Sequence, residues 1–115
     1  MESNITISKF LGDQDIPVVA AVLSIFPDWQ EWNRKNIKNY YQIYIKVSMD
    51  KLEERENKGL YKGAKNGKIT NVVGVDINFP EPINSDLIID NNKDKLNFDQ
   101  LAGDILNSSF FKGWL

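Results

Sequence analysis

The sequence predicts an α/β fold in which a short parallel sheet is flanked by helices, and three observations lead to this prediction. Residues 16–23 form a continuous, β-branched-rich apolar run without alternation, which is typical of a strand buried on both faces. From Asn97 onward, apolar residues recur with the spacing of a core-facing helix. Between these segments, helical and strand patterns alternate, as they do in α/β sheet proteins.

The first 48 residues predict two helices and two strands. Residues 4–14 carry an apolar helical face between a cap signal and a glycine, which favours a short helix. The strand at residues 16–23 follows. Pro27 then begins a helix through Lys38, because proline is favoured in the first helical turn and the acidic Asp28 suits the helix dipole there. Residues 42–48 predict the second strand.

The rest of the chain predicts a short charged helix at residues 49–57, a third strand at residues 84–91, and a final helix. The final helix carries apolar residues at i, i+3, i+4, i+7 and i+8, and Asn97 with Gln100 forms a capping-box pair before it. Residues 58–82, which we call the lid segment, are polar, contain four lysines and four glycines, and end in Pro-Glu-Pro. Such a segment suits a mobile lid that handles phosphate groups.

The amino-acid composition excludes several classes of binding site and of catalysis. The 115 residues suffice for one modest domain, 1–115, and the net charge of −2 gives no global attraction to nucleic acid or to an anionic membrane. Cysteine and histidine are both absent, which excludes disulfides, thiolate metal sites and Cys-His or Ser-His catalysis. The carboxylates show no metal-ligand spacing, so no metal site is predicted. No apolar run suits a signal peptide or a membrane span, and the cytoplasm is the expected location.

Several segments occur in the order of a known family. They are Val18–Ser24, Tyr44–Val47, Arg55–Tyr61 (Arg-Glu-Asn-Lys-Gly-Leu-Tyr), Ala64–Asn71, Val73–Asp76 (Val-Gly-Val-Asp), Phe79–Pro82 and Asp86–Asp90. Together they resemble the carboxyl-terminal half of the adenylylsulfate kinase family, P-loop kinases that phosphorylate the ribose 3′-hydroxyl of adenylylsulfate with ATP. The resemblance runs from about residue 5 to residue 107, and it implies a partial P-loop-kinase-like sheet of about three strands.

The resemblance also implies a site that uses ATP and Mg²⁺. Lysines on a closing segment neutralise charge on a moving phosphoryl group. By this resemblance, Lys58 and Lys62 face phosphates, and Arg55 stacks on the ATP adenine. The nucleotide pocket is shaped by Asn71, Val72, Gly74 and Asp76. Ser24 matches the serine at the end of the first strand. Ser24 is expected to shape the pocket more than to take part in the chemistry.

Two departures affect the expected substrate. The family usually has phenylalanine, which stacks on the substrate adenine, where this chain has Val72. It usually follows its serine directly with proline and, two residues on, with arginine, whereas Trp29 lies near that place here. The substrate could therefore be adenylylsulfate or another nucleotide-linked acid.

A third departure concerns ATP. The sequence contains no Gly-rich loop ending in Gly-Lys-Ser or Gly-Lys-Thr, and in the family the strand before that loop is central to the sheet. We therefore expect the chain to be a truncated or split form that is inactive alone and poorly stable. Its expected partner is an amino-terminal half that carries the phosphate loop, or a second copy of the chain pairing through open strand edges.

Two other interpretations stay open. The chain could be a non-catalytic binding or assembly module derived from the kinase fold, or an unrelated small α/β domain. For single features there are structural interpretations as well: the lysines of the lid segment could only keep it soluble, and Arg55 could belong to a surface ion-pair face. The aromatic residues around Trp29 and Trp32 are expected to pack, because their helix lacks an aligned basic groove for single-stranded nucleic acid.

Overall fold

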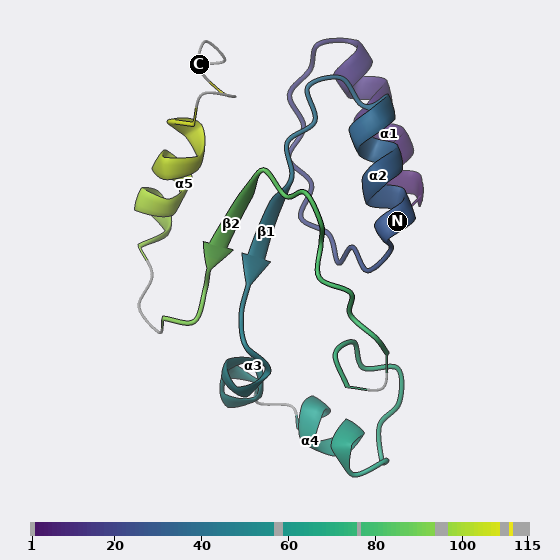
Figure 1. The fold of residues 1–115 in the computed structure, drawn as a ribbon, viewed down its shortest axis with the longest axis vertical. Coiled ribbons are helices and arrows are strands. Elements are labelled where there is room, and N and C mark those ends of the chain that lie inside the picture. Colours follow the sequence, from purple (N-terminus) through teal and green to yellow (C-terminus); the bar gives the residue numbers. More distant parts are fainter. Residues whose placement is uncertain (1, 57–58, 76, 94–96, 109–110, 112–115) are drawn as a thin grey trace.

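Two parallel strands form the sheet of the computed structural model, which describes residues 2–56, 59–75, 77–93, 97–108 and 111 (Figure 1). Strand β1 (Ile43–Lys46) pairs with β2 (Leu87–Asp90), with Ile43 opposite Leu87 and Lys46 opposite Asp90. Parallel strands need a crossover between them, and the segment with α3, α4 and the lid segment supplies it. The α/β class and the strands predicted at residues 42–48 and 84–91 are confirmed.

Five helices accompany the sheet in the described residues: α1 (Glu2–Asp13), α2 (Pro27–Asn36), α3 (Met49–Arg55), α4 (Leu60–Lys65) and α5 (Phe98–Leu106). Four of them confirm the predictions, including the start of α2 at Pro27. The side chain of Asn97 accepts a hydrogen bond of 3.1 Å from the Gln100 amide and so caps α5 as expected. Helix α4 was not predicted, because it lasts only six residues and begins directly after a glycine, Gly59.

The strand predicted at residues 16–23 is wrong. These residues follow an irregular path without a ladder partner in the described part of the chain, and Val19 is 99% exposed. The cause is physical, because a strand is stable only when its backbone groups pair with a neighbour. The apolar run correctly marks residues suited to burial, but among the described residues nothing covers them.

The structure is open. Its radius of gyration is 16.4 Å, whereas a compact chain of this length has about 13 Å. Its accessible surface is 8777 Å², whereas about 6,400 Å² is usual for a folded protein of 13.2 kDa. Among the described residues the buried apolar side chains are Ile5, Ala64 and Val72. Helix α5 was expected to face a core, yet Phe98 is 75% exposed and none of its residues is buried.

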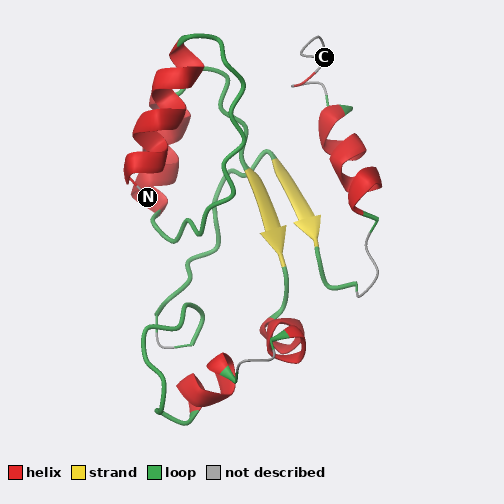
Figure 2. Ribbon diagram, turned by 180° about the vertical axis from the view of Figure 1, so that it is seen from behind, coloured by secondary structure: helices red, strands yellow, loops and turns green. Residues whose placement is uncertain are grey.

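The helices lie on three sides of the sheet (Figures 1 and 2). Helices α1 and α2 are beyond the β1 side, α5 is on the β2 side, and α3 and α4 lie past the ends toward which both strands point. The carboxyl ends of the strands therefore face α3, α4 and the lid segment. Ligands of open α/β sheets bind at that edge. None of the helices described here is long and apolar enough to cross a membrane.

Candidate functional site

The carboxyl ends of β1 and β2 are joined by side chains of the loops that follow them. The Ser48 backbone amide donates to Asn92 Oδ1 at 2.8 Å, and Asn92 Nδ2 donates to Asp90 Oδ1 at 2.7 Å. The backbone amide of Asn92 donates to the same carboxylate at 2.9 Å, and these bonds lower the pKa of Asp90. The edge where a nucleotide is expected is thus a fixed, hydrogen-bonded rim.

Arg55, the expected adenine-stacking residue, lies at this rim. It is in the last turn of α3, and its Nη2 donates to the carbonyl of Lys93 at 2.8 Å. That bond ties α3 to the loop after β2. A planar guanidinium held at the sheet edge can stack on a base, so stacking on the ATP adenine and a surface ion-pair role both stay predictions for Arg55.

The lid segment begins with α4, which is attached to α3. Glu53 of α3 forms an ion pair with Lys65 of α4, and Ala64 is buried. Lys62 lies on the same helix, is exposed, and pairs with no carboxylate in the described part of the chain. It is therefore available to a phosphate group. Lys58, the other expected phosphate-facing residue, is outside the described residues.

The base of the lid segment is a tight turn. The Val72 carbonyl accepts hydrogen bonds from the amides of Val75 at 3.1 Å and Ile77 at 3.2 Å, and the Val72 side chain is 5% exposed. Asn71 just before it has a φ of 62°, in the left-handed region where asparagine is tolerated. Val72 thus packs the turn and presents little surface to a ligand. Asp76 lies outside the described residues.

Gly74 sets this turn against α3. Its φ is 90°, and a Cβ there would meet Met49 Sδ at 3.1 Å. Both the backbone angle and the close approach require glycine. A member of the expected nucleotide pocket is therefore packed against the first residue of α3, the helix that ends in Arg55.

We expect Gly74→Ala to destabilise the chain by about 1 to 3 kcal/mol, because alanine is strained at this φ and must displace Met49. Gly103→Ala is the matched control. Gly103 lies in α5 and a Cβ there meets nothing within 4 Å, so this change should stabilise by up to about 1 kcal/mol. Urea unfolding followed by circular dichroism measures both. Equal effects of the two substitutions would contradict the assigned role of Gly74.

The exit of the lid segment is anchored on β1. Glu81 forms an ion pair with Lys46 at 3.1 Å and accepts a hydrogen bond from the Tyr44 hydroxyl at 3.5 Å. The rings of Tyr44 and Phe79 lie 6.3 Å apart. The hydrogen bond and charge of Glu81 raise the pKa of Lys46. Sequence reasoning did not single out Glu81 or Lys46, whose partnership depends on the paths of β1 and the lid segment.

Ser24 lies just before α2, in a segment without regular secondary structure. Gln30 of α2 donates from Nε2 to the Ser24 carbonyl at 3.1 Å and to its Oγ at 3.3 Å. In the described residues no hydrogen bond or ion pair connects Ser24 to the lid segment. One turn along α2, the Oδ1 of Asn33 is buried without a donor among the described residues.

A second cluster joins α2 to the start of β2. Arg34 contacts Asp86 at 2.8 Å and donates to the Asn84 carbonyl at 2.7 Å, while the Gln42 amide donates to Asp86 at 2.7 Å. The guanidinium lies 4.9 Å from the centre of the Tyr40 ring, and burial raises the pKa of the Tyr40 hydroxyl. This cluster is at the amino ends of the strands and is therefore structural. Local sequence patterns do not reveal it, because Arg34 is about 50 residues from its partners Asn84 and Asp86.

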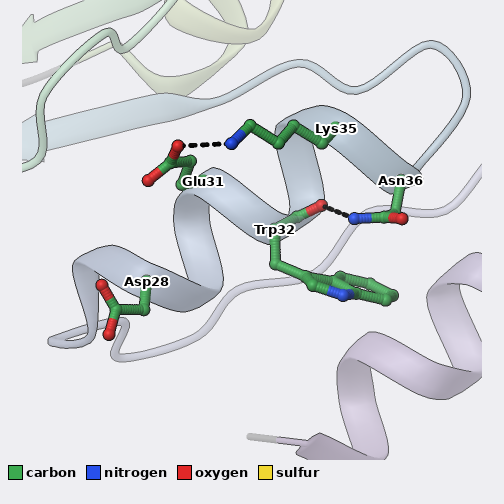
Figure 3. A pocket seen from close by; sticks show the side chains of 5 residues that line it. All are labelled: Asp28, Glu31, Trp32, Lys35 and Asn36. Atoms are coloured by element: carbon green, nitrogen blue, oxygen red, sulfur yellow. Dashed lines mark hydrogen bonds and ion pairs between the residues drawn. The ribbon is translucent and has the colours of Figure 1, made fainter.

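Figure 3 shows a surface hollow of about 260 Å³ on α2, lined by Asp28, Glu31, Trp32, Lys35 and Asn36. Lys35 and Glu31 pair with each other across one helical turn at 2.6 Å. The hollow contains none of the expected site residues. The structure therefore brings Arg55, Gly74 and Lys62 to one edge of the sheet and leaves Ser24 with α2.

The chain is similar to several known proteins. The adenylylsulphate kinase family model matches residues 3–90. A cytidine diphosphoramidate kinase of Campylobacter jejuni is 49% identical over 84 residues, which are 73% of this chain and 49% of that protein. An adenylyl-sulfate kinase of Oceanobacillus iheyensis is 33% identical over 86 residues, 73% of this chain and 43% of that protein.

A probable adenylyl-sulfate kinase of Archaeoglobus fulgidus is 28% identical over 89 residues, 77% of this chain and 57% of that protein. No solved structure gives a significant match. The chain spans about half the length of the curated relatives it matches. On the match over residues 3–90 and these identities, the chain belongs to the adenylylsulfate kinase family of nucleotide kinases.

Proposed function

We propose that this chain supplies the lid segment and the substrate side of a kinase whose phosphate-binding loop lies in a separate segment. The observation that carries this proposal is the uncovered apolar surface at residues 16–23. A buried-strand sequence without a neighbour is what remains when the central strand of a parallel sheet is supplied from elsewhere. In this proposal residues 1–115 are the carboxyl-terminal part of one kinase domain, with residues 58–82 as its lid.

The roles of the site residues follow from their positions. Arg55 is held at the carboxyl edge of the sheet, where its guanidinium stacks on the ATP base. Lys62, with Lys58, meets the phosphates when the lid segment closes, and Gly74 fixes the turn that carries Asn71 and Asp76. ATP and Mg²⁺ are the cofactors, and the phosphate loop of the partner segment supplies most of their contacts.

We further propose that the substrate is a cytidine diphosphoramidate-like nucleotide in preference to adenylylsulfate. The relative named for the former is 49% identical, whereas the adenylyl-sulfate kinases cited above are 28% to 33% identical. The structure supplies a physical reason. Val72 is buried in its turn, so it offers no face on which an adenine could stack, and the smaller pyrimidine needs less of such a platform.

The test compares the chain alone with the chain combined with a segment that carries Gly-x-x-Gly-x-Gly-Lys-Ser/Thr, taken first from any open frame upstream of Met1. Each is assayed with ATP and either cytidine diphosphoramidate or adenylylsulfate, and 3′-phosphorylated product is measured. We expect no turnover alone, turnover in combination, and a higher kcat/KM for the cytidine compound. Turnover at ordinary kinase rates by the chain alone would contradict the proposal.

A non-catalytic assembly module is the second candidate, and the open surface also favours it. The accessible surface exceeds the usual value by about 2,400 Å², an area in the range of permanent interfaces. Light scattering, which shows whether a complex forms, separates the two candidate functions when it is combined with the kinase assay. A stable complex without turnover on either substrate would indicate an assembly role, whereas a complex with turnover indicates the kinase.

A further inference from the structure

One polar side chain stands out from the rest of α2. Gln30 is 8% exposed, although its helix is otherwise rich in exposed charged residues. A buried amide costs free energy unless its hydrogen bonds are satisfied, so a glutamine in this position needs a reason. Its Nε2 contacts both oxygens of one residue, Ser24.

These two bonds hold the Ser24 backbone and orient its hydroxyl group. The bond to the carbonyl holds its backbone, which lies in a segment without secondary structure. The bond to Oγ at 3.3 Å uses a lone pair of the hydroxyl, so the hydroxyl hydrogen must point elsewhere. In the described part of the chain this hydrogen has no acceptor, and Ser24 is only half-buried, so it can reach a ligand.

We propose that Gln30 is a positioning residue that makes the Ser24 hydroxyl a hydrogen-bond donor to an anionic oxygen of the nucleotide-linked acid. This inference rests on the proposed function and extends its substrate side to Ser24. It names a neutral donor where the family pattern has a cation, because Trp29 lies near that place in the sequence. The Trp29 ring contacts Trp32 edge to face at 6.0 Å. Arg34, the nearest arginine along α2, is committed to Asp86 and Asn84.

The test uses the complete kinase, that is, this chain combined with its phosphate-loop segment. Gln30→Leu removes both bonds to Ser24 and puts an apolar side chain of similar size in place of the amide. We expect it to raise KM for cytidine diphosphoramidate by about 10- to 100-fold, with kcat within about threefold and KM for ATP unchanged. Gln14→Leu, which changes an exposed glutamine outside the site, is the matched control and should change none of these values.

A double mutant shows whether Gln30 acts through Ser24. Ser24→Ala should raise the same KM, and Ser24→Ala combined with Gln30→Leu should be no worse than Ser24→Ala alone, because both remove one interaction. The inference would be overturned if the increases in KM of the two single variants multiplied in the double variant, or if KM were unchanged in Gln30→Leu. A general packing defect would instead raise both KM values or lower kcat.

Gln30→Glu covers the case in which the leucine variant does not fold. A carboxylate of the same length accepts the Ser24 hydroxyl hydrogen and repels an anionic substrate, so KM should rise at least as far as in Gln30→Leu. An unchanged KM would again overturn the inference. Absence of turnover in the unsubstituted complex would count against the proposed function itself, and an active complex that is insensitive to residue 30 would count only against this inference.

Discussion

Replacing Lys62 with methionine is expected to lower kcat/KM of the complete kinase by about 10²- to 10³-fold, the usual loss when one preorganised charge is removed from a transition state. Lys62 is exposed on α4, pairs with no carboxylate among the described residues, and lies on the segment that closes over the phosphates in the proposed function. Steady-state rates with ATP and cytidine diphosphoramidate measure the effect.

Lys68→Met is the matched control for that experiment. Lys68 also belongs to the lid segment and is exposed, but it lies beyond α4 in the turn that follows Asn66. If lysines of this segment only confer solubility, both variants should lose solubility alike and neither should lose much rate. A loss of less than about threefold in Lys62→Met would show that this lysine does not contact a reacting phosphate.

The second large effect is on stability. Asp86→Ala is expected to destabilise the chain by about 2 kcal/mol, because it leaves Arg34 and the Gln42 amide without their shared acceptor. The value is below that of a buried ion pair, since the two side chains are 36% and 29% exposed. Urea unfolding followed by tryptophan fluorescence is a suitable measurement, because Trp29 and Trp32 lie on α2, the helix that Arg34 attaches to β2.

Asp86→Asn separates charge from hydrogen bonding. Asparagine keeps an acceptor for the Gln42 amide and loses only the charge that faces Arg34, so we expect about half of the loss caused by alanine. Equal losses in the two variants would indicate that the ion pair alone matters. No loss in either variant would mean that α2 is not attached to the sheet through this cluster.

The fold was predictable where the signal is local. Pro27 at the start of α2, Asn97 capping α5, and the short β-branched runs of β1 and β2 all act through neighbouring residues, and all four elements are present. The strand at residues 16–23 was wrong because burial on two faces requires neighbours, which the described chain does not supply. Local sequence can show that a segment is suited to a sheet interior, but it cannot show that the interior exists.

The candidate site was predictable to the extent that its motif is contiguous. Arg55, Lys62 and Gly74 come from the signature and lid motifs. The structure bonds Arg55 to the loop after β2, packs Gly74 on the first residue of α3 and puts Lys62 on α4, while their roles toward a nucleotide stay predictions. Gln30, Glu81 and Asp86 were missed. Glu81 and Asp86 have partners distant in sequence, and Gln30 bonds to a residue just outside its own helix. Long-range polar pairs of this kind leave no periodicity for sequence reasoning to detect.

The attachment of the lid segment to the stretch 44–49 affects how it can move. Gly74 packs on Met49, and Glu81 bonds to Tyr44 and Lys46, so the turn and the exit both rest on β1 and the residue that opens α3. We therefore expect the segment to unfold together with the strand and not as an independent loop. A segment that pairs with the edge of β1 left open among the described residues would then slow hydrogen exchange in the base of the lid segment as well as in the strand.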